Sequence, residues 1–204
     1  MNPSSQIAMV ILAAGASKRM GEPKQLLLWG DSTLLEHSIE TALDVSANHV
    51  YLVLGANYKT LKSKIESRPV EIIYNPDWEK GLGKSISKAV THLKNSNLKF
   101  DGVLFLLADQ PFITSDYLEQ MIGAFKPKKE QIIATSYVDG ENGVPVLFDA
   151  VYFTELEALN EDKGAKQILK HHKQKVEILF SGTKNIDLDT QTEYVHAYQA
   201  KFKK

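Results

Sequence analysis

The first half of the chain contains four short apolar runs, and these constrain its fold more than any other feature. They are rich in Val, Ile and Leu, they alternate little with polar residues, and they occupy residues 7–12, 50–54, 71–74 and 102–107. This composition is typical of strands that are buried on both faces of a sheet. Parallel neighbours in such a sheet need crossover connections, so the runs predict helices between them.

The segments between these runs have a helical period. In the clearest one, residues 33–43, Thr33 and Glu36 have the spacing of a capping box and apolar residues return on one face. Further helices are predicted at 58–67, 84–94 and 115–125. This alternation predicts the α/β class, with a doubly wound, mostly parallel but mixed sheet and helices on both of its faces.

The second half of the chain has a less regular pattern. It predicts strands at 132–137, 144–148 and 176–180, and helices at 149–159, 165–172 and 190–201. We find no long linker, low-complexity tract or internal repeat in it. The second half is therefore expected to complete the same sheet, in a single domain that spans residues 1–204.

Composition excludes several classes of function. With 204 residues and a net charge of -1, the chain has no basic excess of the kind that binds nucleic acid or anionic membranes. It has no cysteine, which excludes disulfides, thiolate catalysis and cysteine-based metal sites. The polar start "MNPSSQ" does not resemble a secretion signal or a membrane span. We expect a cytoplasmic protein.

A glycine-rich segment with three cations follows the first apolar run. Gly15 and Gly21 enclose small residues, and Lys18, Arg19 and Lys24 lie alongside at the surface, so the loop can surround and neutralise an anion such as a phosphate chain. The segment matches neither the G-x-G-x-x-G dinucleotide pattern nor a Walker A loop. An ordinary turn with solvated lysines is the alternative interpretation.

Carboxylates follow the strands at the same edge of the predicted sheet. Asp109 leaves the run at 102–107, and Asp187 and Asp189 precede the last predicted helix. Magnesium typically binds one or two carboxylates together with waters and substrate phosphates, so Asp109 with Asp187 or Asp189 is a candidate Mg²⁺ site. Asp109 could instead be an ion-pair partner of the cations, and one of the other two could be only a helix cap. We favour Asp187 as the second ligand.

The segment "LAAGASKRMGEPKQLLLWG" resembles the signature of the MobA-like nucleotidyltransferases, within the nucleotide-diphospho-sugar transferase superfamily. The likeness continues through "NPDWEKGLGKSI", "LADQPFI", "NGVPVLF", "EDKGAKQIL" and "IDLDTQTEY", in family order over nearly the whole chain. The "LAAG" and "DQP" segments are most similar to the molybdenum cofactor cytidylyltransferase branch. The resemblance implies a Rossmann-like fold, with a nucleotide-binding half at 1–110 and an acceptor-binding half at 111–204.

The resemblance also implies a role for individual residues. Arg19, Lys24 and Asp109 would be catalytic, with Asp109 joined by Asp187 or Asp189 on Mg²⁺, and Gly83 and Ser85 would contact the base. The nucleotide-binding residues would be Leu12, Ala13, Ala14, Gly15, Ser17, Arg19, Lys24, Gly83, Ser85 and Asp109. The acceptor-binding residues would be Gln110, Gly143, Pro145, Asp162, Gly164 and Lys166.

The implied reaction transfers CMP from CTP to the phosphate of molybdopterin, and a molybdoenzyme is the implied partner. Lys84 before Ser85, and Glu161 and Lys166 in place of Gly and Arg, depart from the family pattern around the two substrate pockets. Guanylyl transfer, activation of a sugar phosphate, or delivery of a nucleotide or cofactor without turnover are the alternatives. Trp29 and Trp78 are interpreted as packing residues.

Overall fold

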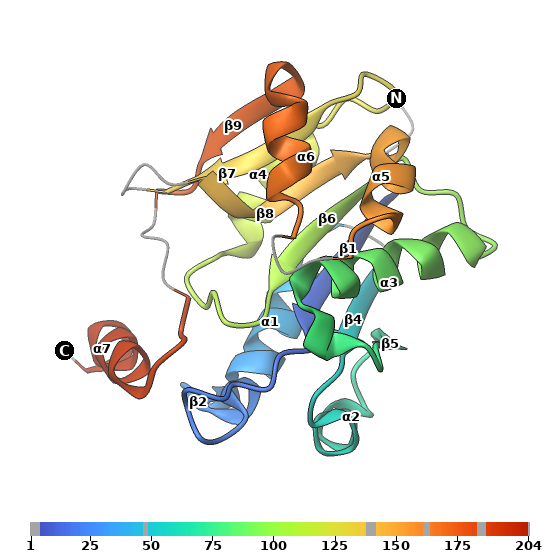
Figure 1. The fold of residues 1–204 in the computed structure, drawn as a ribbon. Coiled ribbons are helices and arrows are strands. Elements are labelled where there is room, and N and C mark those ends of the chain that lie inside the picture. The colour runs from blue at the N-terminus through green and yellow to red at the C-terminus, as the bar shows by residue number, and fades with distance from the viewer. Residues whose placement is uncertain (1–4, 47–48, 138–141, 161–163, 183–186, 204) are drawn as a thin grey trace.

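A seven-stranded sheet forms the centre of the structure, a computed structural model that describes residues 5–46, 49–137, 142–160, 164–182 and 187–203 (Figure 1). The strand order is β5-β4-β1-β6-β8-β7-β9. The strands are β1 (Ile7–Ala13), β4 (His49–Leu54), β5 (Glu71–Tyr74), β6 (Gly102–Leu107), β7 (Ile132–Ser136), β8 (Asn142–Asp149) and β9 (Val176–Phe180). The four apolar runs are therefore strands, as the sequence predicts.

The sheet is mostly parallel, and only β8 runs against its neighbours β6 and β7. Strand β1 lies in the middle, with β4 on one side and β6 on the other. After β1 the chain adds β4 and β5 on one side of this strand, and it then crosses to the other side to form β6. In a doubly wound sheet this reversal marks the place where a ligand binds, beyond the carboxyl ends of the strands. The predicted fold class is confirmed.

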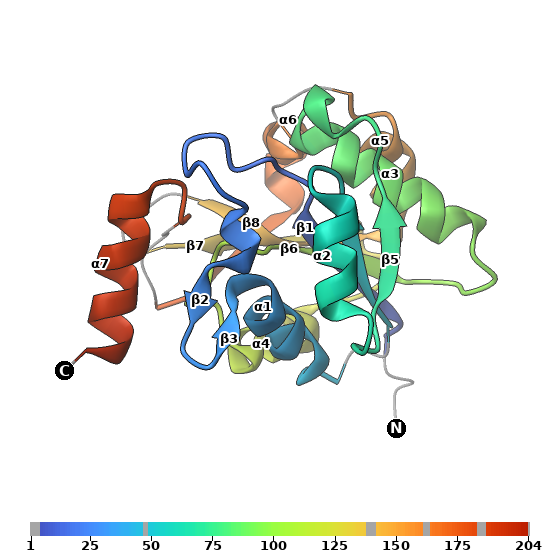
Figure 2. The same ribbon diagram turned by 90° about the horizontal axis from the view of Figure 1, so that it is seen from below.

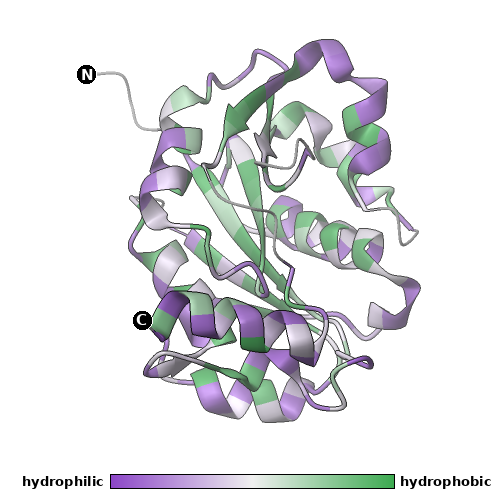
Figure 3. Cartoon of the chain, turned by 90° about the vertical axis from the view of Figure 1, so that its left-hand side faces the viewer, coloured by the Kyte–Doolittle hydropathy of each residue, from purple (hydrophilic) through white to green (hydrophobic). Residues whose placement is uncertain are grey.

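Helices cover both faces of the sheet, and Figure 2 shows the two layers on opposite sides of the strands. The apolar sides of α1 (Leu34–Leu43), α2 (Tyr58–Ile65) and α4 (Ser115–Ala124) pack on one face, with Met9 and Ile11 of β1. Those of α3 (Leu82–Asn95), α5 (Phe153–Glu157) and α6 (Lys166–His171) pack on the other, with Val10 and Leu12. Successive residues of β1 are therefore buried in two cores, which explains the unbroken apolar run. In Figure 3 the strands in the centre of the molecule are largely green, the colour of hydrophobic residues.

Local signals in the sequence place several helix ends. Thr33 caps α1 in a reciprocal capping box, in which its hydroxyl accepts from the Glu36 N–H and the Glu36 carboxylate accepts from the Thr33 N–H. The predicted helix 149–159 is instead a 3₁₀ turn, η3 (Ala150–Tyr152), followed by the short α5, and Asp149 caps the turn. No helix in the described part of the chain is long and apolar enough to cross a membrane.

A small hairpin and the last helix form a third unit beside the sheet, and no pattern in the sequence predicts the hairpin. Its strands, β2 (Leu28–Trp29) and β3 (Ser32–Thr33), are too short to show a period, and Gly30 turns between them at φ +65°. Helix α7 (Gln191–Phe202) packs on this hairpin around the buried Trp29, with Tyr194 Oη donating to the Leu28 carbonyl. Further 3₁₀ turns are η1 (Lys24–Leu26), η2 (Trp78–Lys80) and η4 (Lys173–Lys175).

Candidate active site

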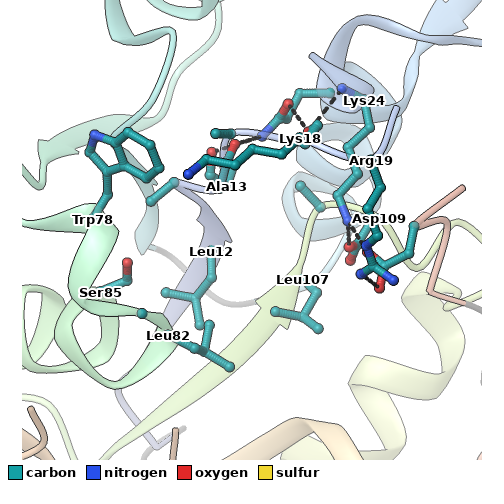
Figure 4. A pocket seen from close by; sticks show the side chains of 18 of the residues that line it. Leu12, Ala13, Lys18, Arg19, Lys24, Trp78, Leu82, Ser85, Leu107 and Asp109 are labelled. Atoms are coloured by element: carbon teal, nitrogen blue, oxygen red, sulfur yellow. Dashed lines mark hydrogen bonds and ion pairs between the residues drawn. The ribbon is translucent and has the colours of Figure 1, made fainter. Parts of the chain in front are cut away.

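A cavity of 620 Å³ opens at the carboxyl ends of β1 and β6, where the strand order reverses (Figure 4). The loop after β1 forms one wall, and the start of α3 forms another. Of the residues predicted to bind nucleotide, all but Gly83 line this cavity: Leu12, Ala13, Ala14, Gly15, Ser17, Arg19, Lys24, Ser85 and Asp109. The fold thus brings together residues from three segments that are far apart in the sequence.

One end of the cavity is highly charged. The Lys24 ammonium lies between two carboxylates, donating to Asp109 Oδ2 and, over 2.7 Å, to Asp189 Oδ1. Arg19 Nη2 pairs with Asp189 Oδ2 at 2.5 Å. The side chains of Lys24 and Asp109 are only 15% and 14% exposed, so the expectation that Lys24 lies at the surface is wrong. Little water therefore screens the Lys24–Asp109 pair.

These ion pairs control the protonation of their members. Burial by itself would lower the pKa of the Lys24 ammonium, but the pairs with Asp109 and Asp189 outweigh burial and hold this pKa above 10.5. Burial would raise the pKa of Asp189, and the hydrogen bonds and charges of Lys24 and Arg19 reverse that effect, so the pKa lies below 3.8. At neutral pH Lys24 is a cation and Asp189 an anion.

The opposite end of the cavity contains fewer charged groups, and Trp78, Leu82 and Ser85 lie there in Figure 4; Glu79, next to Trp78 in the chain, is also a lining residue. The Ser85 hydroxyl is buried and accepts from Asn75 Nδ2 at 3.0 Å. A Cβ on Gly55 would come within 2.4 Å of Trp78 Cβ, so Trp78 packs closely on the loop after β4. Trp78 also lines the cavity, so it is not only the packing residue that the sequence predicts. Gly83 is buried in the first turn of α3 and does not line the cavity.

A second cavity of 440 Å³ lies between β8 and α6, and it contains most of the residues expected to bind an acceptor. Apolar side chains form much of its wall, and its polar lining includes Gln110, Gly143, Gly164, Lys166 and Asp187. Two residues expected to bind an acceptor are not placed in this cavity. Pro145 is not among its described lining residues, and Asp162 lies outside the residues that the structure describes.

The two carboxylates before α7 therefore belong to different cavities. Asp189 lines the charged end of the first cavity, whereas Asp187 lines the second and accepts from Gln110 Nε2 at 2.8 Å. Burial and the nearby Asp109 carboxylate raise the pKa of Asp187. Neither residue caps α7: Thr190 does so, accepting from the Glu193 N–H in a capping box, which corrects the expectation that one aspartate is only a cap.

The charged end has the chemistry of a divalent-cation site that is completed by its ligand. Asp109 Oδ1 is buried and has no hydrogen-bond partner among the described residues. The same residues contain no cluster of three or more acidic, His or Cys side chains that could hold a metal by themselves. Two carboxylates with the remaining positions left to phosphate oxygens and water are typical of Mg²⁺. The residues present therefore fit such an ion.

Comparisons with known proteins agree with this geometry. The family model for the MobA-like NTP transferase domain matches residues 9–176. The chain is 32% identical over 168 residues to purine catabolism protein PucB of Bacillus subtilis (strain 168), a match that covers 79% of each chain. It is 30% identical over 191 residues to nicotine blue oxidoreductase of Paenarthrobacter nicotinovorans, covering 90% of this chain and 91% of that protein.

Solved structures include a relative with a bound metal. The crystal structure of Rv0371c from Mycobacterium tuberculosis H37Rv in complex with manganese aligns with a TM-score of 0.80 and 26% sequence identity, over 96% of this chain and all of that one (100%). The family model, the two sequence relatives and this crystal structure thus each align with most of the chain.

Proposed function

The chain belongs to the MobA-like NTP transferase family and is a nucleotidyltransferase, and we propose that it transfers CMP from CTP to the phosphate of a molybdopterin-type acceptor, releasing pyrophosphate. The observation that carries the proposal is the contact of Lys24 with both Asp109 and Asp189 in a cavity at the reversal of strand order. Cations for a triphosphate and carboxylates for a metal meet there. The "LAAG" and "DQP" segments support the choice of CTP.

The polarity of the first cavity supports one orientation of the nucleotide. The triphosphate binds at the charged end, between Arg19, Lys24 and the loop after β1. The base binds at the opposite end, where Trp78 offers an aromatic surface and Ser85 a hydroxyl. Lys18 extends along the cavity between the two ends (Figure 4), which places a third cation beside the phosphate chain.

Asp109 and Asp189 are the residues that would hold Mg²⁺. They face a common point, because the Lys24 ammonium contacts both of them, whereas Asp187 is turned to the second cavity. This geometry favours Asp189 over Asp187 as the partner of Asp109. A bound divalent cation would neutralise charge on the phosphates and fix their orientation.

The reaction requires positioning and charge stabilisation rather than a strong base. An oxygen of the acceptor phosphate, already ionised near neutral pH, attacks the α-phosphorus of CTP. The new P–O bond joins CMP to the acceptor, and the bond between the α-phosphorus and the bridging oxygen breaks, so that pyrophosphate leaves with the electron pair. Arg19 and Lys24 stabilise the charge on the leaving group, and each such contact typically contributes about 3–4 kcal/mol.

The second cavity supports an acceptor that is partly apolar and carries a phosphate. Leu107 and Leu12 line both cavities, so an acceptor in the second cavity lies next to the nucleotide in the first. Lys166 and Lys170 line the second cavity and can attract a phosphate there. Gln110 and Asp187 offer hydrogen-bond partners for the N–H groups of a heterocycle.

The test is release of pyrophosphate from CTP, GTP, ATP and UTP, each measured with and without purified molybdopterin cofactor. We expect release that depends on both CTP and molybdopterin. Stronger turnover with GTP would overturn the choice of CTP, and turnover that requires a sugar phosphate would overturn the acceptor. Binding of CTP without release under any condition would favour a delivery protein, and neither binding nor release would favour a different activity, such as that in the name of the Paenarthrobacter relative.

A further inference from the structure

Gln25 is buried under the loop that carries Gly15 and Arg19, although it directly follows the charged Lys24 in the sequence. It is 2% exposed. Its Nε2 donates to two carbonyls of that loop, Gly15 at 2.9 Å and Ala13 at 3.2 Å. Both donor positions of the amide are thereby used on the backbone that leaves β1.

Ser17 extends this network to Lys24. Its hydroxyl donates to Gln25 Oε1 at 3.3 Å and accepts from the backbone N–H of Lys24 at 3.1 Å. Ser17 adopts φ +54°, a left-handed conformation that side chains other than glycine rarely take. The hydrogen bonds of Ser17 therefore hold a strained turn, and a continuous chain of contacts connects the end of β1 to the residue that carries the Lys24 ammonium.

The loop that Gln25 supports keeps a row of donors available. The backbone N–H groups of residues 15–19 donate no hydrogen bond within the described part of the chain. A peptide unit is planar and trans, so its carbonyl and its N–H point in opposite directions. Because the Gly15 carbonyl points to Gln25, the N–H of Ala16 in the same peptide unit points away from it. The loop thus has the form of an anion-binding nest.

We infer that Gln25 is a positioning residue for triphosphate binding: it borders the first cavity, but its amide is used on Ala13, Gly15 and Ser17, and it acts by orienting the peptide units of the loop after β1 so that their N–H groups meet the phosphate oxygens. The inference rests on the proposed binding of a nucleoside triphosphate by this loop. The alternative is a purely structural role, in which the buried Gln25 amide does no more than satisfy the carbonyls of Ala13 and Gly15.

The test replaces Gln25 with methionine, which has a similar length and no amide. Gln131→Met is the matched control, because Gln131 is also buried and its amide also makes three contacts, to Lys126 N, Ala124 O and Glu177 Oε2. Inorganic tripolyphosphate and CTP are the binding probes. We expect Gln25→Met to weaken both and to lower kcat/KM for CTP by on the order of a hundredfold, as misplacement of a binding loop does. Gln131→Met should lose comparable thermal stability and bind both probes like the wild type.

A readout without ligand separates loop order from global stability. Hydrogen exchange of the Met20 and Lys24 amides, which donate to Ser17, should accelerate in Gln25→Met and remain unchanged in Gln131→Met. If Gln25→Met fails to fold, Ser17→Gly takes its place, because glycine tolerates φ +54° and lacks the hydroxyl that joins Gln25 to Lys24. It should show the same pair of effects.

The outcomes also distinguish this inference from the proposed function. If the wild type binds neither CTP nor tripolyphosphate, the proposed function fails. If the wild type binds them and the folded Gln25→Met or Ser17→Gly variant binds them equally well with unchanged exchange, the positioning role of Gln25 is wrong while the proposed function stands.

Discussion

Lys24 and Asp109 form an ion pair that joins the loop after β1 to the end of β6, across 85 residues of sequence. The sequence favours different partners for the two residues, a phosphate for Lys24 and a metal ion for Asp109, with an ion pair between Asp109 and the cations as the alternative. In the structure they neutralise each other, and Lys24 also contacts Asp189. Binding of a metal and a triphosphate therefore requires Lys24 to exchange its carboxylate partners for phosphate oxygens.

This exchange predicts opposite effects of Lys24→Met on two ligands. The kcat/KM for CTP should fall by about a hundredfold to a thousandfold, because a charge contact to the leaving group is lost. Affinity for Mn²⁺ in the absence of nucleotide should rise, because the ammonium no longer competes for Asp109 and Asp189. Kinetics of pyrophosphate release and the paramagnetic resonance of free Mn²⁺ measure the two effects.

Lys94→Met is the control for this experiment, since Lys94 also pairs with a carboxylate, Glu157, but lies away from the cavity. It should leave both ligands unaffected. Equal or weaker binding of Mn²⁺ by folded Lys24→Met would show that Lys24 does not compete with the metal.

Asp109→Asn should abolish metal-dependent turnover. The amide keeps the shape of the side chain, but it removes the charge that would bind a divalent cation and leaves an N–H₂ group where Lys24 now pairs. Asp77→Asn is the control, because Asp77 forms an exposed ion pair with Lys80 and does not line the cavity. Wild-type turnover in Asp109→Asn would contradict the proposed metal site.

The two aspartates before α7 should have different functions. Asp189→Asn is expected to lower metal-dependent turnover as Asp109→Asn does, because both carboxylates face the Lys24 ammonium. Asp187→Asn is expected to change the KM for the acceptor and leave the KM for CTP unchanged, because Asp187 lines the second cavity. The reverse pattern in the two KM values and in the metal dependence would assign the metal to Asp187.

The substitutions Asp189→Asn and Asp187→Asn should also change the Tm at pH 7 in opposite directions. The pKa of Asp189 is lowered in the folded state, so its ionised form stabilises the fold above pH 3.8 and this contribution is lost as the pH falls through the folded-state pKa. Asp189→Asn should therefore lower the Tm at pH 7, by an amount that corresponds to about 1 kcal/mol or less for a partly exposed pair. The difference from the wild type should vanish in acid.

Asp187 has a raised pKa, so its ionised form costs stability at pH 7, and the cost disappears as the pH falls toward 3.8. Asp187→Asn should raise the Tm at pH 7, by about 2–4 °C for each kcal/mol of relieved cost. An asparagine carbonyl can still accept from Gln110. Calorimetric Tm values between pH 3 and pH 8 test both signs, and a lower Tm for Asp187→Asn at pH 7 would show that its carboxylate stabilises the fold.

The sequence predicted the sheet because its strands are buried on both faces and leave a continuous apolar run, as β1 does. It did not predict the hairpin of β2 and β3, whose two-residue strands show no period. Asp109 was recognisable because it ends an apolar strand. Asp189 pairs with Lys24, and Asp187 pairs with Gln110. Both contacts depend on how α7 packs on the hairpin, and a local sequence pattern does not predict that packing. The sequence did not indicate that Gln25 is buried, because a glutamine beside a lysine usually lies at the surface.

Gly15 provides a prediction that separates binding from folding. Its φ lies outside the left-handed region, and a Cβ built on it meets no atom within 4 Å, so the fold itself does not require glycine there. Gly15 lines the first cavity, where the proposed triphosphate approaches the backbone. The missing side chain of Gly15 therefore leaves space for the ligand, and no neighbouring protein atom requires that space.

Gly15→Ala should keep the free energy of unfolding of the unliganded protein within about 0.5 kcal/mol of the wild-type value, as substitutions without a clash usually do. It should weaken binding of CTP, because the methyl group occupies space next to the phosphate chain. Gly123→Ala is the matched control: Gly123 lies in α4, a Cβ there also meets nothing within 4 Å, and alanine should stabilise the helix by roughly 0.5–1 kcal/mol without affecting CTP. Calorimetric titration with CTP measures the affinities. Unchanged affinity in Gly15→Ala would show that the phosphate chain does not pass Gly15.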